Sequence, residues 1–279
     1  MTAAVFFAVL LAALLHAGWN AVVKLGLDRF SSILVLALFQ SAIAGALLPF
    51  VPWPAAASWP WLIGGSLLHT GYKLFLIRAY RHGELGQVYP LARGAAPLLV
   101  AVAGAMLLGE RLSATGIAAI AAVVAGILLI ALGGKAGARL SGPALFWALG
   151  TACFTAGYTL VDGHGARLSG TALGFALWLF LIDGLSMVAV ALATRGPAAF
   201  AVLRPAWRGG LAAGAMSLGS YSIAIWAFTQ APLALVAALR ETSILFALLI
   251  GALLLGERID LRRWLAGALI VAGVVLMRL

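Results

Sequence analysis

The sequence predicts an all-α membrane protein of ten transmembrane helices, arranged as two inverted five-helix repeats. Composition is the first observation behind this prediction: hydrophobic residues make up 64% of the 279 residues and charged residues only 9%. Soluble domains carry about 25% charged residues because they need a wettable surface, so this composition indicates a polytopic membrane protein. The second observation is a duplication. Arg93–Arg111 recurs as Arg240–Arg258, with the same arginine at its start and the same Leu-Leu-Gly-Glu-Arg at its end.

Ten segments have the length of about 20 mainly apolar residues that a helix needs to cross the hydrocarbon core. They are residues 3–23, 31–50, 59–80, 85–108, 113–132, 143–162, 171–193, 208–229, 232–255 and 263–278. Short breaks with turn residues separate them, for example Asp28-Arg29, Gly163-His164-Gly165 and Gly196-Pro197. Backbone polar groups in lipid must be bonded internally, so each segment is predicted to be a helix.

The odd number of helices in each copy predicts how the copies are related. Five crossings place the second copy upside down, so repeats 1–137 and 138–279 are expected to share a pseudo-two-fold axis in the membrane plane. The first helices of the two copies also correspond, because Ala17-Gly18-Trp19 matches Ala156-Gly157-Tyr158. Transporters built in this way hold their substrate near mid-membrane, between the copies.

Several classes of protein are excluded by charge and motifs. The net charge is +10, but the eighteen basic residues form no run or stripe, so we expect no nucleic-acid partner. The single cysteine, Cys153, rules out an intrachain disulfide. No Walker loop, His-Glu-x-x-His or Gly-x-Ser-x-Gly motif is present, and the four histidines are not at metal-ligand spacing. The sequence therefore predicts a protein that is not an enzyme and has neither a cofactor nor a metal.

Ten short-looped helices in two copies, with a Gly-Glu-Arg after the fourth helix of each, resemble the EamA-like family of the drug/metabolite transporter superfamily. Within that family the chain is most similar to the YddG-type bacterial amino-acid exporters. The resemblance implies a multi-pass protein of the bacterial inner membrane. It also implies export of amino acids, aromatic and other, or of similar small metabolites, by alternating access through a central cavity. The implied partners are a small-molecule solute and the lipid bilayer.

The orientation of the termini stays open. Most of the eighteen basic residues lie in the loops after the odd-numbered helices. The positive-inside rule would then place both termini outside the cytoplasm. Members of the family are thought to keep both termini in the cytoplasm, so the two indications conflict.

The third predicted helix carries the best candidate binding surface. His69, Tyr72, Lys73, Leu76 and Tyr80 have the spacing of one helical stripe. A charge inside the hydrocarbon needs a reason to persist, so this stripe is predicted to line the cavity, with the Lys73 ammonium holding a substrate carboxylate. Alternatively, Lys73 snorkels to the interface or pairs with an acidic residue.

Aromatic residues on other helices complete the predicted cavity. Trp19 and Tyr158 are expected to face each other across the repeat axis, and Tyr221 lies on the polar side of the eighth helix. The alternative for the polar stripes around Trp19 and Tyr158 is ordinary hydrogen bonding between helices.

The repeat-related arginines have two readings each. Arg93, with Tyr89, is read as ligating an anionic substrate group, and Arg240, beside Glu241, is read as holding the bundle together; either could play the other role. Asp183 and Glu241 are candidates for proton coupling, or are simply counter-ions of basic residues. Glu110-Arg111 and Glu257-Arg258 are expected to act locally, at the corners after their helices.

Three other functions are alternatives. A multidrug exporter of the same fold would prefer an acidic aromatic cavity, and a cavity with Lys73 and Arg93 speaks against it. An intramembrane enzyme would need a catalytic arrangement that the sequence does not supply. A membrane assembly protein that moves no solute would need a large exposed partner surface.

Overall fold

The structure is a computed structural model that describes residues 1–23, 27–82, 85–131, 141–255 and 260–278, with the backbone alone described at 23, 85–87, 89 and 254–255. The prediction of an all-helical chain is confirmed for these residues. The helices are α1 Ala3–Val23, α2 Arg29–Leu47, α3 Trp59–His82, α4 Leu85–Leu108, α5 Ala114–Ala131, α6 Gly142–Leu168, α7 Ala172–Arg195, α8 Leu203–Phe228, α9 Leu233–Arg240, α10 Ser243–Leu255 and α11 Leu261–Leu276. Three short 3-10 helices join them, η1 Leu48–Phe50, η2 Ala56–Ser58 and η3 Pro197–Val202.

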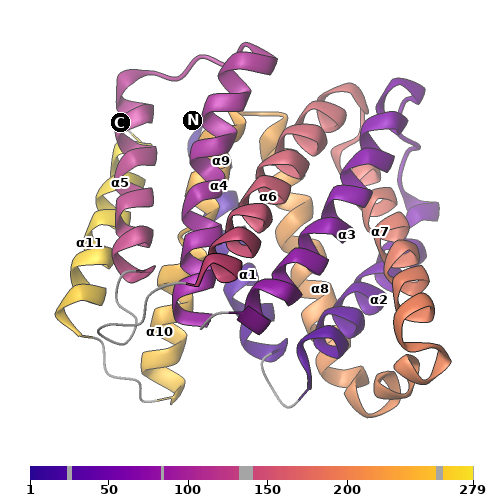
Figure 1. Ribbon diagram of the computed structural model, residues 1–279. Helices are drawn as coiled ribbons and strands as arrows, with labels where there is room; N and C mark the ends of the chain where they lie inside the picture. The colour runs from indigo at the N-terminus through magenta and orange to yellow at the C-terminus, as the bar shows by residue number, and fades with distance from the viewer. Residues whose placement is uncertain (24–26, 83–84, 132–140, 256–259, 279) are drawn as a thin grey trace.

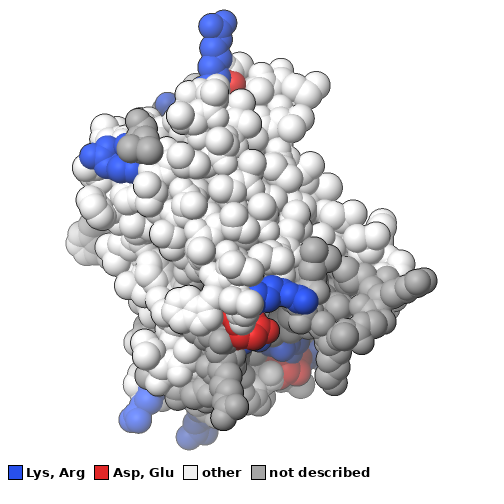
Figure 2. Space-filling model, turned by 90° about the vertical axis from the view of Figure 1, so that its left-hand side faces the viewer, with Lys and Arg blue, Asp and Glu red and all other residues white. Residues whose placement is uncertain are grey.

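Eight helical segments of the described chain are long and apolar enough to cross a membrane. The predicted spans 59–80 and 263–278 are not among them. The first corresponds to α3, which carries many polar side chains, and the second to α11, which has only 16 residues. Figure 2 shows one face of the molecule. On this face the charged side chains lie toward the two ends, and an uncharged band separates them.

The predicted break at Gly163-His164-Gly165 is wrong, because α6 continues through it to Leu168. The two glycines serve close packing between helices and do not form a turn. A Cβ added at Gly163 would lie 2.4 Å from Leu233 Cδ2, and one at Gly165 would lie 2.6 Å from Trp61 Cβ. Glycine at both positions therefore lets neighbouring segments approach α6, as small residues do in membrane bundles.

The ninth predicted helix, 232–255, is interrupted and forms α9 and α10. At the break each backbone N–H donates to the carbonyl three residues earlier. Glu241 N–H donates to the Ala238 carbonyl at 3.1 Å, and Thr242 N–H donates to the Leu239 carbonyl at 3.1 Å. The Thr242 hydroxyl also donates to the Leu239 carbonyl, at 2.7 Å. The interruption places the Glu241 side chain inside the bundle, where it is 4% exposed.

Helices from the two halves of the chain pack against one another. The main pairs are α1 with α8, α2 with α7, α3 with α6 and α5 with α11. Figure 1 shows α5 beside α11 at one edge of the molecule and α2 near α7 at the other. Because each pair takes one helix from each half, the halves interlock across most of their length.

The contact between α5 and α11 is reciprocal. A Cβ added at Gly126 would lie 2.7 Å from the Ala266 carbonyl oxygen, and one added at Gly273 would lie 2.7 Å from the Ala119 carbonyl oxygen. Gly126 and Gly273, which are equivalent positions of the sequence repeat, therefore make equivalent close contacts.

This contact gives a first prediction. Gly126→Ala is expected to destabilise the protein by about 1–3 kcal/mol, because the added methyl meets backbone that cannot rotate away. The matched control is Gly142→Ala at the start of α6, where an added Cβ meets nothing within 4 Å. Chemical unfolding in detergent micelles measures both variants, and equal losses of stability would contradict the close contact.

The start of α2 and the end of α7 are joined by an exposed ion pair between Asp28 and Arg195. Asp28 caps α2 by accepting from Phe30 N–H at 3.1 Å, and Arg195 Nη2 donates to the same carboxylate at 3.0 Å. The hydrogen bond from Arg195 lowers the pKa of Asp28 from 3.8 to about 2. The pair therefore links the first half of the chain to the second at its exposed end.

This pKa has a definite sign for stability. A depressed folded-state pKa stabilises the fold above the unfolded value of 3.8, and the contribution is lost as the pH falls through about 2. Asp28→Asn keeps a good helix cap, so at pH 7 it should cost less than about 1 kcal/mol for this partly exposed pair. Thermal unfolding between pH 2 and 6 should show a weaker acid dependence in the variant. If the variant keeps the wild-type acid dependence, that dependence arises from other carboxylates.

Candidate functional site

Among the described residues, three ion pairs are buried at both partners, and each joins residues 1–137 to residues 138–279. They are His69–Asp162, Lys73–Asp183 and Arg93–Glu241. Charges buried in this way persist only when they are paired and hydrogen-bonded, or when function needs them. The interior between the two halves is therefore where a functional site is to be sought.

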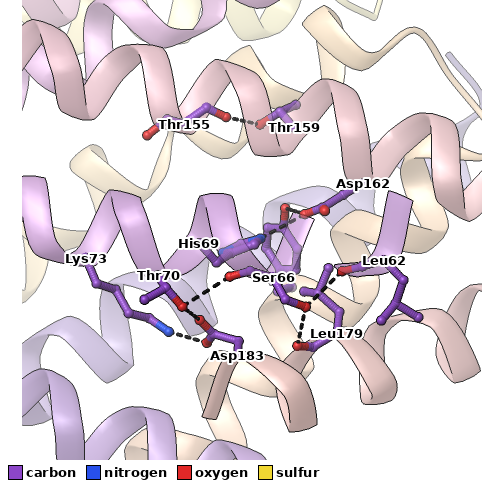
Figure 3. A network of polar contacts seen from close by, with 11 residues as sticks. Leu62, Ser66, His69, Thr70, Lys73, Thr155, Thr159, Asp162, Leu179 and Asp183 are labelled. Atoms are coloured by element: carbon purple, nitrogen blue, oxygen red, sulfur yellow. Dashed lines mark hydrogen bonds and ion pairs between the residues drawn. The ribbon is translucent and has the colours of Figure 1, made fainter. Parts of the chain in front are cut away.

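Lys73 and Asp183 form a pair between α3 and α7. The Lys73 ammonium contacts the Asp183 carboxylate, and the Thr70 hydroxyl donates to the same carboxylate at 3.2 Å. Both charged side chains are buried. Figure 3 shows them directed toward each other. Lys73 thus faces the protein interior and is paired with Asp183. This agrees with the alternative interpretation, in which Lys73 and Asp183 are counter-ions of each other.

His69 and Asp162 form a second group with Tyr221. His69 Nε2 lies 2.8 Å from Asp162 Oδ2, and the Tyr221 hydroxyl donates to the same oxygen at 2.6 Å. The Tyr158 ring is stacked on the His69 ring, with centroids 4.0 Å apart. Figure 3 shows His69, on α3, directed toward Asp162 on α6. The group therefore joins α3, α6 and α8.

The repeat-related arginines have different surroundings. Arg93 Nε donates to Glu241 Oε2 at 2.8 Å. The Arg240 guanidinium lies over the Tyr221 ring, 4.8 Å from its centroid, and its Nε is buried with no hydrogen-bond partner among the described residues. Arg93 therefore has a carboxylate partner, whereas Arg240 keeps a buried donor without a partner among the described residues.

A small cavity lies where these arginines meet, between α4, α6 and the region of α9. Its volume is about 10 Å³, close to what one water molecule needs. Its lining consists of Arg93, Ala96, Pro97, Val100, Thr155, Tyr158, Thr159, Ala237, Arg240 and Glu241. Two guanidinium groups and one carboxylate leave this lining with an excess positive charge, so it is suited to a carboxylate and too small, in this conformation, for an amino acid.

The structure brings only some of the predicted site residues to this cavity. Arg93, Tyr158, Arg240 and Glu241 line it, whereas the predicted stripe on α3 lies outside its lining. Of the stripe, Tyr72 packs edge-on against Tyr158, with ring centroids 5.6 Å apart.

Two more predicted residues, Tyr80 and Trp19, lie apart from the cavity lining. Tyr80 lies under the Arg29 guanidinium, 5.2 Å from it. Trp19 packs against His16, and its indole Nε1 is buried without a partner among the described residues. The Tyr89 side chain lies outside the described part of the chain.

Asp162 was missed as a site residue because of the wrongly predicted break beside it. A helix that ends at 162 would place this aspartate at the membrane surface. Since α6 continues to Leu168, Asp162 is fully buried, with 0% exposure. The available signal was its place on the helical stripe of Thr155, Tyr158 and Thr159.

Glu110 also differs from expectation, because it reaches the other half of the chain. Its carboxylate accepts from Arg167 Nη2 at 2.7 Å and from Leu233 N–H at 2.9 Å, so it caps the start of α9. Arg167 in turn donates to the Phe228 carbonyl at 2.9 Å. Glu110, which follows α4, is therefore linked through Arg167 to the ends of α6 and α8. Its repeat counterpart, Glu257, lies outside the described residues.

Known proteins with a related sequence or fold place the chain in a family. The family model of the EamA-like transporter family matches residues 3–132 and again residues 142–279. A solved structure described as "Crystal structure of protein" has a TM-score of 0.78 at 18% identity, covering 99% of this chain and 96% of that one, which shows the fold alone. No curated protein matches the sequence. Because the family model covers nearly the whole sequence, this chain belongs to the EamA-like transporter family and is a membrane transporter of the drug/metabolite transporter superfamily.

Proposed function

We propose that this protein exports amino acids or similar carboxylate-bearing metabolites across the bacterial inner membrane by alternating access, as the YddG-type exporters that it resembles are thought to do. The observation that carries the proposal is the cavity between the halves, where Arg240 presents a guanidinium with an unused donor beside the Arg93–Glu241 pair. Guanidinium groups bind carboxylates with two parallel hydrogen bonds. The solute carboxylate therefore binds Arg240.

The proposed solute is a small one with an apolar or aromatic part. Tyr158 offers a ring face to the cavity, and Ala96, Pro97 and Val100 offer apolar surface. Glu241 provides a carboxylate for a solute ammonium. An α-amino acid matches this set, because it carries a carboxylate, an ammonium group and a side chain on one carbon.

We also propose that ten helices cross the membrane, α9 and α10 together forming one crossing, and that 1–137 and 138–279 are inverted repeats. The reciprocal contacts of Gly126 and Gly273 support a two-fold axis between the halves. The packing of α1 on α8 and of α6 on α3 supports the same axis, because the repeat relates α1 to α6 and α8 to α3. Rocking of the halves about this axis would enlarge the cavity toward each side of the membrane in turn. Such a motion would break ion pairs between the halves on one side and form others on the opposite side.

Flux through the purified protein in proteoliposomes tests the proposed function. A panel of labelled amino acids is compared with lipophilic cations of the kind that multidrug exporters move, with and without a pH gradient. Amino-acid flux above that of protein-free vesicles is the expected result. Flux of the cations alone would favour a multidrug exporter of the same fold, and no flux of any solute would favour a membrane assembly protein.

A further inference from the structure

Asp162 differs from the other buried carboxylates at the interface between the halves. Asp183 is in contact with the Lys73 ammonium, and Glu241 accepts from Arg93. Asp162 instead has an imidazole and a phenol as partners, both on Oδ2. Its Oδ1 is buried with no hydrogen-bond partner in the described part of the chain. A buried carboxylate without a cation in contact is costly unless a proton or a nearby charge compensates it.

The charge that can compensate Asp162 is that of Arg240, across the Tyr221 side chain. The Tyr221 ring faces the Arg240 guanidinium at 4.8 Å, and its hydroxyl is bonded to Asp162. Arg240 has an unused donor, and Asp162 has an unused acceptor. Tyr221 thus separates the Arg240 guanidinium, which has no carboxylate hydrogen-bonded to it in the described part of the chain, from Asp162, whose bonded partners are an imidazole and a phenol.

The other charged and titratable groups around Asp162 are already engaged with one another. They come from the elements packed against α6 and from α6 itself: His69 and Lys73 on α3, Arg93 on α4, Asp183 on α7, Tyr221 on α8, Arg240 on α9, and Tyr158 and His164 on α6. Lys73 is paired with Asp183, and Arg93 is bonded to Glu241. Tyr158 stacks on His69, and His164 packs on Trp61. Among the described residues, an ionised Asp162 is therefore balanced by Arg240, or by His69 once the imidazole carries a proton.

We infer that the His69–Asp162 pair is a proton-binding site linked to the solute site, so that one proton is bound together with one solute carboxylate. The inference rests on the proposed function. When a solute carboxylate takes the charge of Arg240, Asp162 loses its compensation, and a proton from water binds the pair, on Asp162 or on His69.

Linkage makes the inference measurable at the level of binding. With phenylalanine as the probe, the Kd of the purified wild-type protein should rise between pH 6 and 8, by at most about tenfold per pH unit for one linked proton. A pH-sensitive dye in weak buffer should record proton uptake on addition of phenylalanine. Phenethylamine, which has the ring and the ammonium group but no carboxylate, should cause no uptake.

Asp162→Asn gives the decisive comparison, because asparagine resembles the protonated aspartate and can still accept from Tyr221. The variant should bind phenylalanine at pH 8 as tightly as the wild type does at pH 6, and without proton uptake. Tighter binding at high pH cannot arise from a merely damaged fold. The double variant Lys73→Gln with Asp183→Asn replaces the other buried pair by neutral groups and should retain the wild-type pH slope.

The outcomes separate this inference from the proposed function. If the wild type binds phenylalanine and Asp162→Asn keeps the wild-type pH slope, the proton site is elsewhere, although the transport proposal stands. The same conclusion follows if phenethylamine causes equal proton uptake. If the wild type binds no phenylalanine at either pH, the amino-acid function fails and the inference fails with it.

Discussion

Arg93→Met is expected to destabilise the protein by about 3–5 kcal/mol, the usual cost of leaving one member of a buried ion pair without its partner. Glu241 is 4% exposed, and the guanidinium of Arg93 donates to it at 2.8 Å. The pair also joins α4 to the interruption between α9 and α10. Loss of the cation therefore leaves a buried carboxylate at the point where the two halves meet.

A double variant separates charge from packing. In Arg93→Met with Glu241→Gln the carboxylate is removed as well, so most of the lost stability should return. Chemical unfolding of the wild type, both single variants and the double variant completes the cycle. If Arg93→Met costs less than about 1 kcal/mol, the pair behaves like an exposed one, and its role in joining the halves is contradicted.

The membrane-spanning helices could be predicted from the sequence because hydropathy over about 20 residues is a local property. The inward orientation of the stripe on α3 could be predicted for a similar reason, since helical spacing places His69, Tyr72 and Lys73 on one face. All three are buried or partly buried in the structure. Their partners could not be predicted, because Asp162 and Asp183 reach them only when the two halves pack.

The predicted break at Gly163 and the predicted continuous helix 232–255 both differ from the structure, although 233–253 is long and apolar enough to form one membrane span. Glycine can end a helix or can allow close packing inside it, and the sequence around Gly163 does not distinguish these uses. The ninth helix was predicted to be continuous because apolar residues flank the polar run Arg240–Ser243 on both sides, whereas in the structure the helix is interrupted at this run, where Glu241 accepts from Arg93. Both errors fell beside functional candidates, since one hid Asp162 and the other concealed how Glu241 enters the cavity lining.

Arg240→Gln should have the opposite profile to Arg93→Met, with a large effect on solute binding and a small one on stability. A hydrogen bond to a charged group contributes about 1.5–3 kcal/mol, so the Kd for phenylalanine should rise by about 10–100-fold. No carboxylate in the described part of the chain is hydrogen-bonded to Arg240, and Asp162 takes up a proton when that charge is lost, so near pH 6 the stability cost should be that of the contact with Tyr221, about 1–2 kcal/mol.

Arg240→Lys is the matched control, because it keeps the charge and loses the planar pair of donors. Its Kd should lie between those of the wild type and Arg240→Gln, since charge alone restores only part of the binding of a carboxylate. Binding is measured by equilibrium dialysis of labelled phenylalanine, and stability by chemical unfolding of the same samples. If Arg240→Gln unfolds as readily as Arg93→Met and the small amount of folded protein binds phenylalanine normally, Arg240 holds the bundle together, as the sequence alone suggested. The carboxylate site must then be sought at another cation.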